Sequence, residues 1–305
     1  MNPVFSIVVN CKNGERYLKE ALDSIYNQTY QDWEIIFFDN GSTDGSRSIA
    51  RSYDSKIKIH AAENPMNLGT ARHKAIDLCV GNYVCFLDVD DIYIATKLED
   101  QLRIFKDEKV KLISGGINVI DDKGSILRNL IPDISGEDVF ESLLKNYQLF
   151  MPTVAIDLKY IRKNHHNFDS NLSHSPDYKL FMTIAQEANI YISKEIYAQY
   201  RIHDSNLSVE MRKVAGSEWI SALEYLQSDE RLNYLSERHE NAFKQLKAKA
   251  KILMALEPLH KRDRWGSIRE LFLIRPLSLR SGVLLMLLLL PLPSSFLLKI
   301  IYFDR

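Results

Sequence analysis

The chain has 305 residues, which is long enough for one large domain or for a domain with an appendage. Apolar residues make up 46% of the chain and charged residues 26%, proportions that are ordinary for a folded, water-soluble protein. The formal net charge of −1 gives no reason to expect a nucleic-acid partner, so we predict none.

Short apolar runs alternate with helical patterns over the first 120 residues. Four of the runs predict strands, at residues 5–9, 34–38, 57–60 and 83–87. Three helices are predicted between them: one with Leu18, Ala21, Leu22 and Ile25 on a single face, one near residues 44–53, and one that Asn67 caps and that runs to residue 78. Such alternation predicts an α/β fold with a doubly wound, mainly parallel sheet.

Polar clusters follow three of the predicted strands, at residues 10–13, 39–42 and 88–91. In doubly wound sheets ligands bind outside the carboxyl ends of the strands. The topology therefore predicts one binding site that these three clusters share.

Three carboxylates, Asp88, Asp90 and Asp91, follow the strand at residues 83–87 within four positions. Anions that close repel one another, and their pKa values rise unless a cation compensates them. Oxygen ligands at a strand end suit Mg²⁺ or Mn²⁺ holding a diphosphate. The alternative is that Asp91 caps a helix beginning near Ile94 and that the other two are solvated loop acids.

The pattern is mixed after residue 104. A hairpin is predicted from residues 112–120 and 125–131 around the turn at residues 121–124, followed by a helix at 135–146, an extended run at 153–158, a helix at 177–188 and a strand at 196–203. From residue 217 onward a 3.6-residue period predicts helices alone. We therefore expect one domain over residues 1–210, with halves at about 1–120 and 121–210, and a helical extension over 211–305.

The extension ends in a basic, Leu-rich tail. Residues 244–280 contain ten Lys or Arg against three acids, and residues 281–298 carry no charge. The uncharged run nearly reaches the roughly 20 residues of a membrane span, but Pro291 and Pro293 interrupt it. We expect the tail to lie in or on a membrane surface; a full span and a helix buried against the domain are the alternatives.

The cysteines and the N-terminus favour a cytoplasmic protein. Cys11, Cys79 and Cys85 have neither the spacing of a metal site nor an even number for a disulfide framework. The first residues lack the basic region and the long apolar run of a signal peptide. We therefore expect a cytoplasmic protein that associates peripherally with the inner face of the cell membrane.

Five motifs follow one another between residues 5 and 208. In chain order they are Ser6-Ile7-Val8-Val9-Asn10-Cys11-Lys12-Asn13-Gly14 with Gln28-Thr29 after it, Glu34-Ile35-Ile36 leading to Asp39-Asn40-Gly41-Ser42-Thr43-Asp44, Asn67-Leu68-Gly69 with Arg72, Gly81-Asn82-Tyr83 leading to Asp88-Val89-Asp90-Asp91, and Tyr200-Arg201-Ile202-His203. Taken together, these motifs resemble the family 2 inverting glycosyltransferases of the GT-A fold. The resemblance implies a GT-A nucleotide-diphospho-sugar transferase fold for this part of the chain.

The resemblance also implies where the nucleotide-sugar binds. It places Asn10, Asp39 and Asn40 beside the nucleobase and Arg72 near the nucleotide; the alternatives are that the two Asn form turns and that Arg72 pairs with a local acid. The chain has Asn10-Cys11-Lys12-Asn13 and Asp39-Asn40 where family members often have Pro-x-Tyr-Asn and two Asp. Both UDP- and dTDP-sugars therefore stay open as donors.

The resemblance assigns the acidic motif and a late histidine to the diphosphate. Asp88 faces the ribose, and Asp90 reaches a Mn²⁺ or Mg²⁺ ion, with Asp91 as the competing candidate. His203 approaches the same metal or diphosphate.

A general base is implied at the start of a later helix. Asp177 occupies that place, although Pro176 stands where family members usually have another acid. The alternative is that Pro176 and Asp177 only begin the helix.

The resemblance thus implies a metal-dependent inverting glycosyltransferase with a glycan or lipid-linked acceptor. Residues 261–265 echo the Q-x-x-R-W signature of processive synthases but lack its Gln, so we expect transfer of one sugar. The alternative function is a non-catalytic nucleotide-binding scaffold of an envelope-glycan complex, which needs no base.

Overall fold

The structure, a computed structural model, describes residues 2–134, 138–173, 175–204, 206, 214–228, 239–261, 263–273, 279–289, 293 and 297. The chain divides into two compact units, Met1–Asp204 and Ser205–Arg305. The division falls a few residues before the boundary expected at residue 210.

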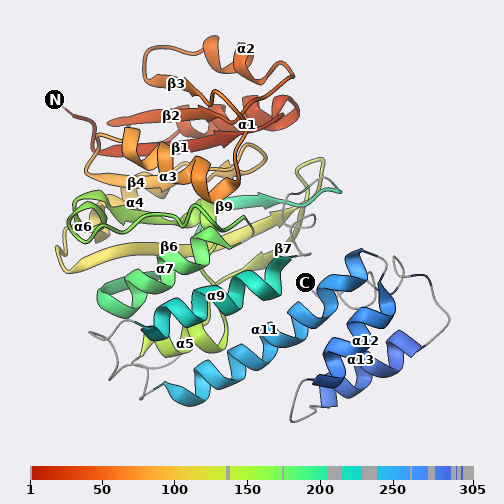
Figure 1. Ribbon diagram of the computed structural model, residues 1–305. Helices are drawn as coiled ribbons and strands as arrows, with labels where there is room; N and C mark the ends of the chain where they lie inside the picture. Colours follow the sequence, from red (N-terminus) through yellow and green to blue (C-terminus); the bar gives the residue numbers. More distant parts are fainter. Residues whose placement is uncertain are drawn as a thin grey trace. The chain divides into compact units, whose positions relative to one another are not determined.

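Four parallel strands form the first half of the sheet in unit 1: β1 (Phe5–Cys11), β2 (Trp33–Asp39), β3 (Ile57–Ala61) and β4 (Tyr83–Phe86). They lie in the order β3-β2-β1-β4 (Figure 1). Nearly every residue of β1 and β2 is buried, as expected for parallel strands that are covered on both faces. Because Cys11 pairs with Asp39 and Val8 with Phe86, the carboxyl ends of β1, β2 and β4 meet at one edge.

The second half of the sheet is mixed. It contains β5 (Ile92–Tyr93), β6 (Val110–Ile120), β7 (Ile126–Leu130), β8 (Ala155–Asp157) and β9 (Asn189–Arg201). The order continues from β4 through β8, β6 and β9 to β5, and β7 pairs with β6. Strand β8 is antiparallel to β4 and β6, whereas β9 is parallel to β6. This arrangement brings the end of β9 to the edge where β1, β2 and β4 end.

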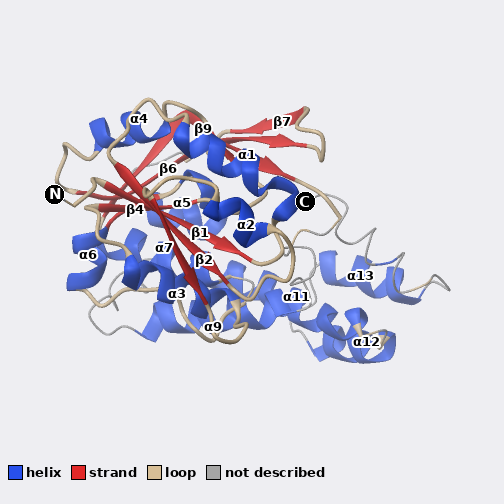
Figure 2. Ribbon diagram, turned by 90° about the horizontal axis from the view of Figure 1, so that it is seen from above, coloured by secondary structure: helices blue, strands red, loops and turns tan. Residues whose placement is uncertain are grey.

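Helices cover both faces of the sheet (Figure 2). The helices on one face are α1 (Glu15–Tyr26), α2 (Ser46–Arg51) and α4 (Lys97–Ile104), and those on the other are α3 (Leu68–Leu78), α6 (Leu158–Lys163) and α7 (Pro176–Glu187). Apolar residues of α1 pack on alternate residues of β1 and β2. On the other face the Phe86 ring lies 5.3 Å from Phe168 and 6.4 Å from Phe181.

A cap and a close approach fix the start of α3. The Asn67 side chain accepts a hydrogen bond from the Thr70 N–H at 2.8 Å, as the sequence predicts. Gly69 lies so near the loop at residues 169–172 that a Cβ atom there would overlap the Asp169 carbonyl oxygen. Glycine at this position therefore lets the loop that leads into α7 approach α3.

The structure differs from the sequence-based expectations in several elements. Ile92 and Tyr93 pair with β9 as strand β5, so α4 begins at Lys97 with Thr96 as its N-cap, and the expectation that Asp91 caps a helix near Ile94 is wrong. The extended run expected at 153–158 contains the 3₁₀ turn η1 (Met151–Thr153) and β8, and α6 then begins at Leu158. The hairpin of β6 and β7 is confirmed. The helix expected at 135–146 is α5 (Val139–Lys145), and residues 135–137 lie outside the described residues.

Unit 2 contains helices α9 (Ala215–Ser228), α11 (Glu240–His260), α12 (Arg264–Leu273) and α13 (Leu279–Leu289). Apolar residues of α11, α12 and α13 form its core. Among the residues that the structure describes, no helix has both the length and the apolar character needed to span a membrane. Most of the tail after residue 289, together with Arg275 and Lys299, lies outside the described residues.

Candidate active site

Asp39 ends β2, and its carboxylate is committed to contacts within the chain. Its Oδ1 accepts the Ser42 N–H at 2.9 Å, and its Oδ2 accepts Nε of Arg47 at 2.9 Å. Burial alone would raise the pKa of Asp39, but the bonds from Ser42 and Arg47 lower it below its usual value. Asp39 is therefore an ionised, buried anchor for the turn that follows β2.

Asn40 and Asn10 lie at the same edge but differ in their partners. The Asn40 side chain makes two hydrogen bonds to the main chain of Met66. Its Nδ2 donates to the Met66 carbonyl oxygen at 2.7 Å, and its Oδ1 accepts the Met66 N–H at 2.9 Å. The Oδ1 atom of Asn10 is buried and has no hydrogen-bond partner among the described residues. Asn40 thus fixes the loop before α3, whereas the Asn10 oxygen can accept a bond from a ligand.

Arg72 on α3 connects two acidic side chains. Its buried guanidinium donates from Nη2 to Oδ1 and Oδ2 of Asp88, at 2.9 and 3.2 Å. Its Nη1 lies 4.0 Å from Oδ1 of Asp177. Arg72 thus pairs with Asp88 of the acidic motif, as the alternative supposed, and its place near the nucleotide stays a prediction.

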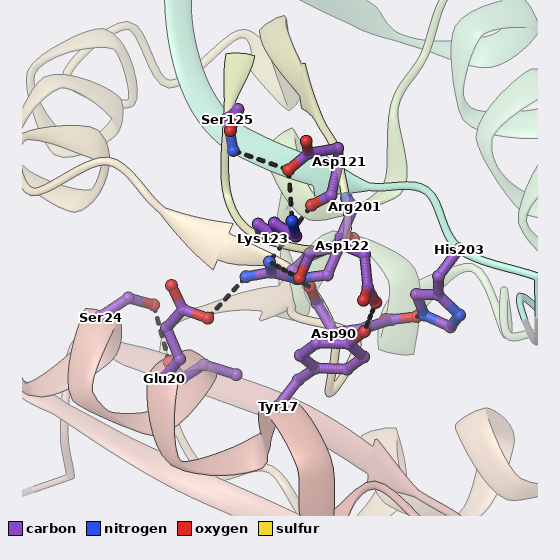
Figure 3. Close-up of polar contacts among 12 residues, drawn as sticks. Tyr17, Glu20, Ser24, Asp90, Asp121, Asp122, Lys123, Ser125, Arg201 and His203 are labelled. Carbon is purple, nitrogen blue, oxygen red and sulfur yellow. Dashed lines mark hydrogen bonds and ion pairs between the residues drawn. The ribbon is translucent and has the colours of Figure 1, made fainter. Parts of the chain in front are cut away.

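Asp90 and His203 form a pair at the ends of β4 and β9. Nε2 of His203 lies 3.0 Å from Oδ2 of Asp90, and both side chains are mostly buried (Figure 3). Asp91 points elsewhere: its Oδ1 accepts the Arg201 N–H at 3.0 Å, and its residue is fully buried. The structure therefore brings His203 to Asp90 and holds Asp91 within the fold.

The three carboxyl groups of the acidic motif lie close enough for their charges to raise the pKa values of Asp90 and Asp91. Burial and then the charge of Asp88 raise the pKa of Asp90, although His203 partly offsets the rise. Burial and the charges of Asp90 and Asp88 raise the pKa of Asp91 well above its usual range. A carboxylate next to an imidazole, with further acids behind it, is a donor set that fits a divalent cation.

Asp177 lies in the first turn of α7, where Ser175 is the N-cap. Its side chain is 21% exposed, so it is open to solvent on one side. Tyr147 lies close by, and the burial of its hydroxyl group, followed by the charge of Asp177, raises the pKa of that group. Asp88 and Asp177 thus approach two different nitrogens of the Arg72 guanidinium, Nη2 and Nη1.

Three residues around Asp90 and His203 were not assigned from the sequence. Tyr17 of α1 stacks on the His203 ring at 5.2 Å, and its hydroxyl group donates to Asp122. The Arg201 guanidinium also lies over the Tyr17 ring, 4.7 Å from its centroid. A signal existed for Arg201, because strand alternation places it on the same face as His203. Tyr17 and Asp122 carry no comparable signal.

The arrangement of the sheet is shared with solved glycosyltransferases. The mannosyltransferase PcManGT from Pyrobaculum calidifontis, in complex with GDP-Man and Mn²⁺, matches with a TM-score of 0.61 at 14% identity, over 100% of this chain and 89% of that one. Residues 1–349 of TarS from S. aureus, in complex with UDP-GlcNAc, match with a TM-score of 0.58 at 20% identity, over 88% and 89% of the two chains. The predicted GT-A fold, with a helical C-terminal part, is confirmed.

The sequence comparisons show the family. The model of glycosyl transferase family 2 matches residues 6–169, which is more than half of the chain. The UDP-Glc:alpha-D-GlcNAc-diphosphoundecaprenol beta-1,3-glucosyltransferase WfgD of Escherichia coli is 28% identical over 217 residues, 70% of this chain and 83% of that protein. The chain belongs to glycosyl transferase family 2 and is a glycosyltransferase, as the five motifs predicted.

Proposed function

We propose that the chain is a metal-dependent, inverting glycosyltransferase that moves one sugar from a UDP- or dTDP-sugar to a glycan or a lipid-linked acceptor. The observation that carries the proposal is the position of Arg72. Its guanidinium contacts Asp88 of the acidic motif and lies 4.0 Å from Asp177. One side chain is therefore close to both the proposed donor site and the candidate base.

In this proposal Asp177 is the general base. It accepts the proton of the acceptor hydroxyl group while that oxygen attacks the anomeric carbon. The bond from the anomeric carbon to the diphosphate breaks on the opposite face, so the configuration inverts and the nucleoside diphosphate leaves. Arg72 keeps positive charge beside Asp177 and Asp88 throughout.

Asp90 and His203 are the proposed metal ligands, and their separation of 3.0 Å supports a shared ion. When bound, Mn²⁺ or Mg²⁺ would supply positive charge to the departing diphosphate. Asp88 is proposed to face the ribose. Asn10, whose buried Oδ1 has no hydrogen-bond partner among the residues that the structure describes, is proposed to accept an N–H of the nucleobase, while Asp39 and Asn40 shape the pocket wall.

The donor is the least constrained part of the proposal. WfgD is named for UDP-Glc and a diphosphoundecaprenol-linked acceptor, and the TarS structure holds UDP-GlcNAc. These names favour a UDP-sugar and a lipid-linked glycan, whereas PcManGT holds GDP-Man. A panel of UDP-, dTDP- and GDP-sugars therefore belongs in the first assay.

The base is tested with Asp177→Asn. We expect kcat to fall by about 10²–10⁴-fold, while nucleotide affinity stays unchanged. Asp157→Asn is the matched control, because Asp157 is similarly exposed (19%) but pairs with Lys111 and caps α6. Full transfer by Asp177→Asn would remove the base from the proposal. Nucleotide binding without transfer from any donor, in the wild type, would favour the scaffold instead.

We also propose that unit 2 holds the protein to the inner face of the cell membrane. Trp265 on α12 is 75% exposed and Met286 on α13 is 71% exposed, although α13 also packs its Leu284 and Leu288 into the core of the unit. Exposed basic side chains such as Lys261 and Arg269 accompany these apolar ones. Apolar side chains among cations suit a surface of anionic lipid.

Cosedimentation with vesicles tests the membrane proposal. The full chain should pellet with phosphatidylglycerol vesicles and less with phosphatidylcholine vesicles. The double variant Trp265→Ser with Met286→Ser, and a truncation after Arg275, should each stay in the supernatant. Truncated protein that still pellets with anionic vesicles would contradict a role for the tail.

A further inference from the structure

Arg201, at the end of β9, is buried much more deeply than a residue of a solvent-exposed motif needs to be. Its side chain is 2% exposed, and all three of its guanidinium nitrogens donate to polar partners. It donates from Nε to the carbonyl oxygen of Asp90 at 3.0 Å, and from Nη1 to those of Asp121 and Asp122 at 3.3 Å each (Figure 3). Its Nη2 donates to Oε2 of Glu20 at 2.5 Å.

These contacts join three segments that are far apart in the sequence. Asp90 belongs to the loop after β4, residues 121 and 122 begin the turn of the β6–β7 hairpin, and Glu20 belongs to α1. The turn is itself rigidly closed, because Oδ1 of Asp121 accepts the N–H groups of Lys123 and Ser125 at 2.9 and 2.8 Å. Arg201 therefore fixes the Asp90 main chain to a structured frame.

The same frame orients His203. The Tyr17 ring contacts both groups: the Arg201 guanidinium lies 4.7 Å from its centroid, and the centroid of the His203 ring lies 5.2 Å from it. The Tyr17 hydroxyl group is bonded to the Asp122 carboxylate, which is also paired with Arg16. Because Arg201 holds the turn that carries Asp122, it also limits the position of the ring against which His203 packs.

We propose that Arg201 is a positioning residue that holds the Asp90 carboxylate and the His203 imidazole at the separation one divalent ion requires. The inference rests on the proposed metal site but concerns a residue that touches neither metal nor donor. The planar guanidinium can donate to three carbonyl groups and a carboxylate at once, whereas a lysine ammonium at the same place has three donors and a different shape.

The test is the affinity of the full-length protein for Mn²⁺ in excess UDP. It is measured from the electron paramagnetic resonance signal of the Mn²⁺ that stays free. Groups that orient metal ligands typically contribute about 10–100-fold to metal affinity, and we expect a loss in that range for Arg201→Lys. Glu20→Gln removes the charge that holds Nη2 from a partly exposed position, so it should fold and show a smaller loss in the same direction. UDP affinity measured in EDTA should stay at the wild-type value.

Arg162→Lys is the matched control, because Arg162 also donates to a main-chain carbonyl group at 2.6 Å, but that group belongs to Cys79, which precedes β4, whereas Asp90 follows it. It should bind Mn²⁺ as the wild type does. Unchanged Mn²⁺ affinity in both Arg201→Lys and Glu20→Gln would overturn the positioning role and leave the metal site intact. A wild-type protein that does not bind Mn²⁺ would overturn the metal site and, with it, the role of Arg201.

Discussion

Gly69→Ala tests whether close packing against α3 places the base. The added Cβ atom would overlap the Asp169 carbonyl oxygen and lie 2.5 Å from that of Leu172. A comfortable C···O contact is about 3.3 Å or longer, so the loop at residues 169–172 has to move by roughly 1 Å. Both obstacles are main chain, and no rotamer change relieves them.

The expected loss of stability follows from the bonds that this movement strains. The loop accepts hydrogen bonds from Gly69 N–H at 3.2 Å, from Asn67 Nδ2 at 2.7 Å and from Thr70 Oγ1 at 3.0 Å. Each is worth about 0.5–1.5 kcal/mol, and alanine returns at most about 1 kcal/mol of helix propensity. We expect a net loss of about 1–3 kcal/mol, in the usual range for an overpacked site.

Urea unfolding, monitored by circular dichroism, measures the free energy of unfolding. Initial rates of sugar transfer measure how far the proposed base, Asp177, is displaced from its working position. Because the loop leads into α7, kcat should fall more than nucleotide affinity, by up to about 10²-fold for a shift of 1 Å. Thr70→Val is the control, since it removes one bond to the loop without added bulk. Wild-type stability and kcat in Gly69→Ala would refute the packing argument.

The remaining predictions concern single polar groups. Glu34 accepts bonds from Ser6 and from the Val80 N–H and pairs with Lys58, and these contacts lower its pKa although burial alone would raise it. The stabilisation from these contacts is present above the unfolded pKa, near 4.3, and is lost as the pH falls through the lower pKa of the folded state. Glu34→Gln should therefore lower the free energy of unfolding by about 1–3 kcal/mol at pH 7 and by little near pH 3. Urea unfolding that finds equal losses at the two pH values would contradict this. Asn10→Ala removes a buried oxygen that has no partner in the described part of the chain, so the free protein should be no less stable, while UDP affinity falls by about tenfold, the equivalent of 1.4 kcal/mol. Calorimetry that finds unchanged UDP affinity would exclude Asn10 from the nucleobase pocket.

The edge that carries the site was predictable because it depends on strand order alone. Strands at residues 5–9, 34–38 and 83–87 were visible as apolar runs, and parallel pairing brings their polar carboxyl ends together. Strand β5 was not predictable, because two residues give no periodic signal and only their pairing with β9 makes them a strand. The same holds for α6, which is a short helix directly after a three-residue strand.

The side-chain partners in the site were less predictable than the site itself. The sequence suggested Asp39 and Asn40 as nucleobase contacts, whereas their polar atoms bond mainly to Ser42, Arg47 and Met66. The spacing of Asp39 and Ser42 is that of a turn in which a side chain accepts an N–H, so part of this pattern was present. Arg72 reaching two acids, and Arg201 reaching three segments, depend on tertiary packing that one sequence does not encode locally.

The most direct test of the account is thermal unfolding with UDP, in Mn²⁺ or EDTA, for the wild type, Asp90→Asn and Asp91→Asn. A ligand at a hundredfold its dissociation constant adds about 2.7 kcal/mol, which corresponds to a rise in Tm of roughly 5–10 °C for a domain of this size. We predict that the wild type and Asp91→Asn show the Mn²⁺-dependent part of this rise and that Asp90→Asn loses it. A rise that survives in Asp90→Asn and disappears in Asp91→Asn would contradict the assignment of the metal ligand, and no rise with UDP in the wild type would contradict the site.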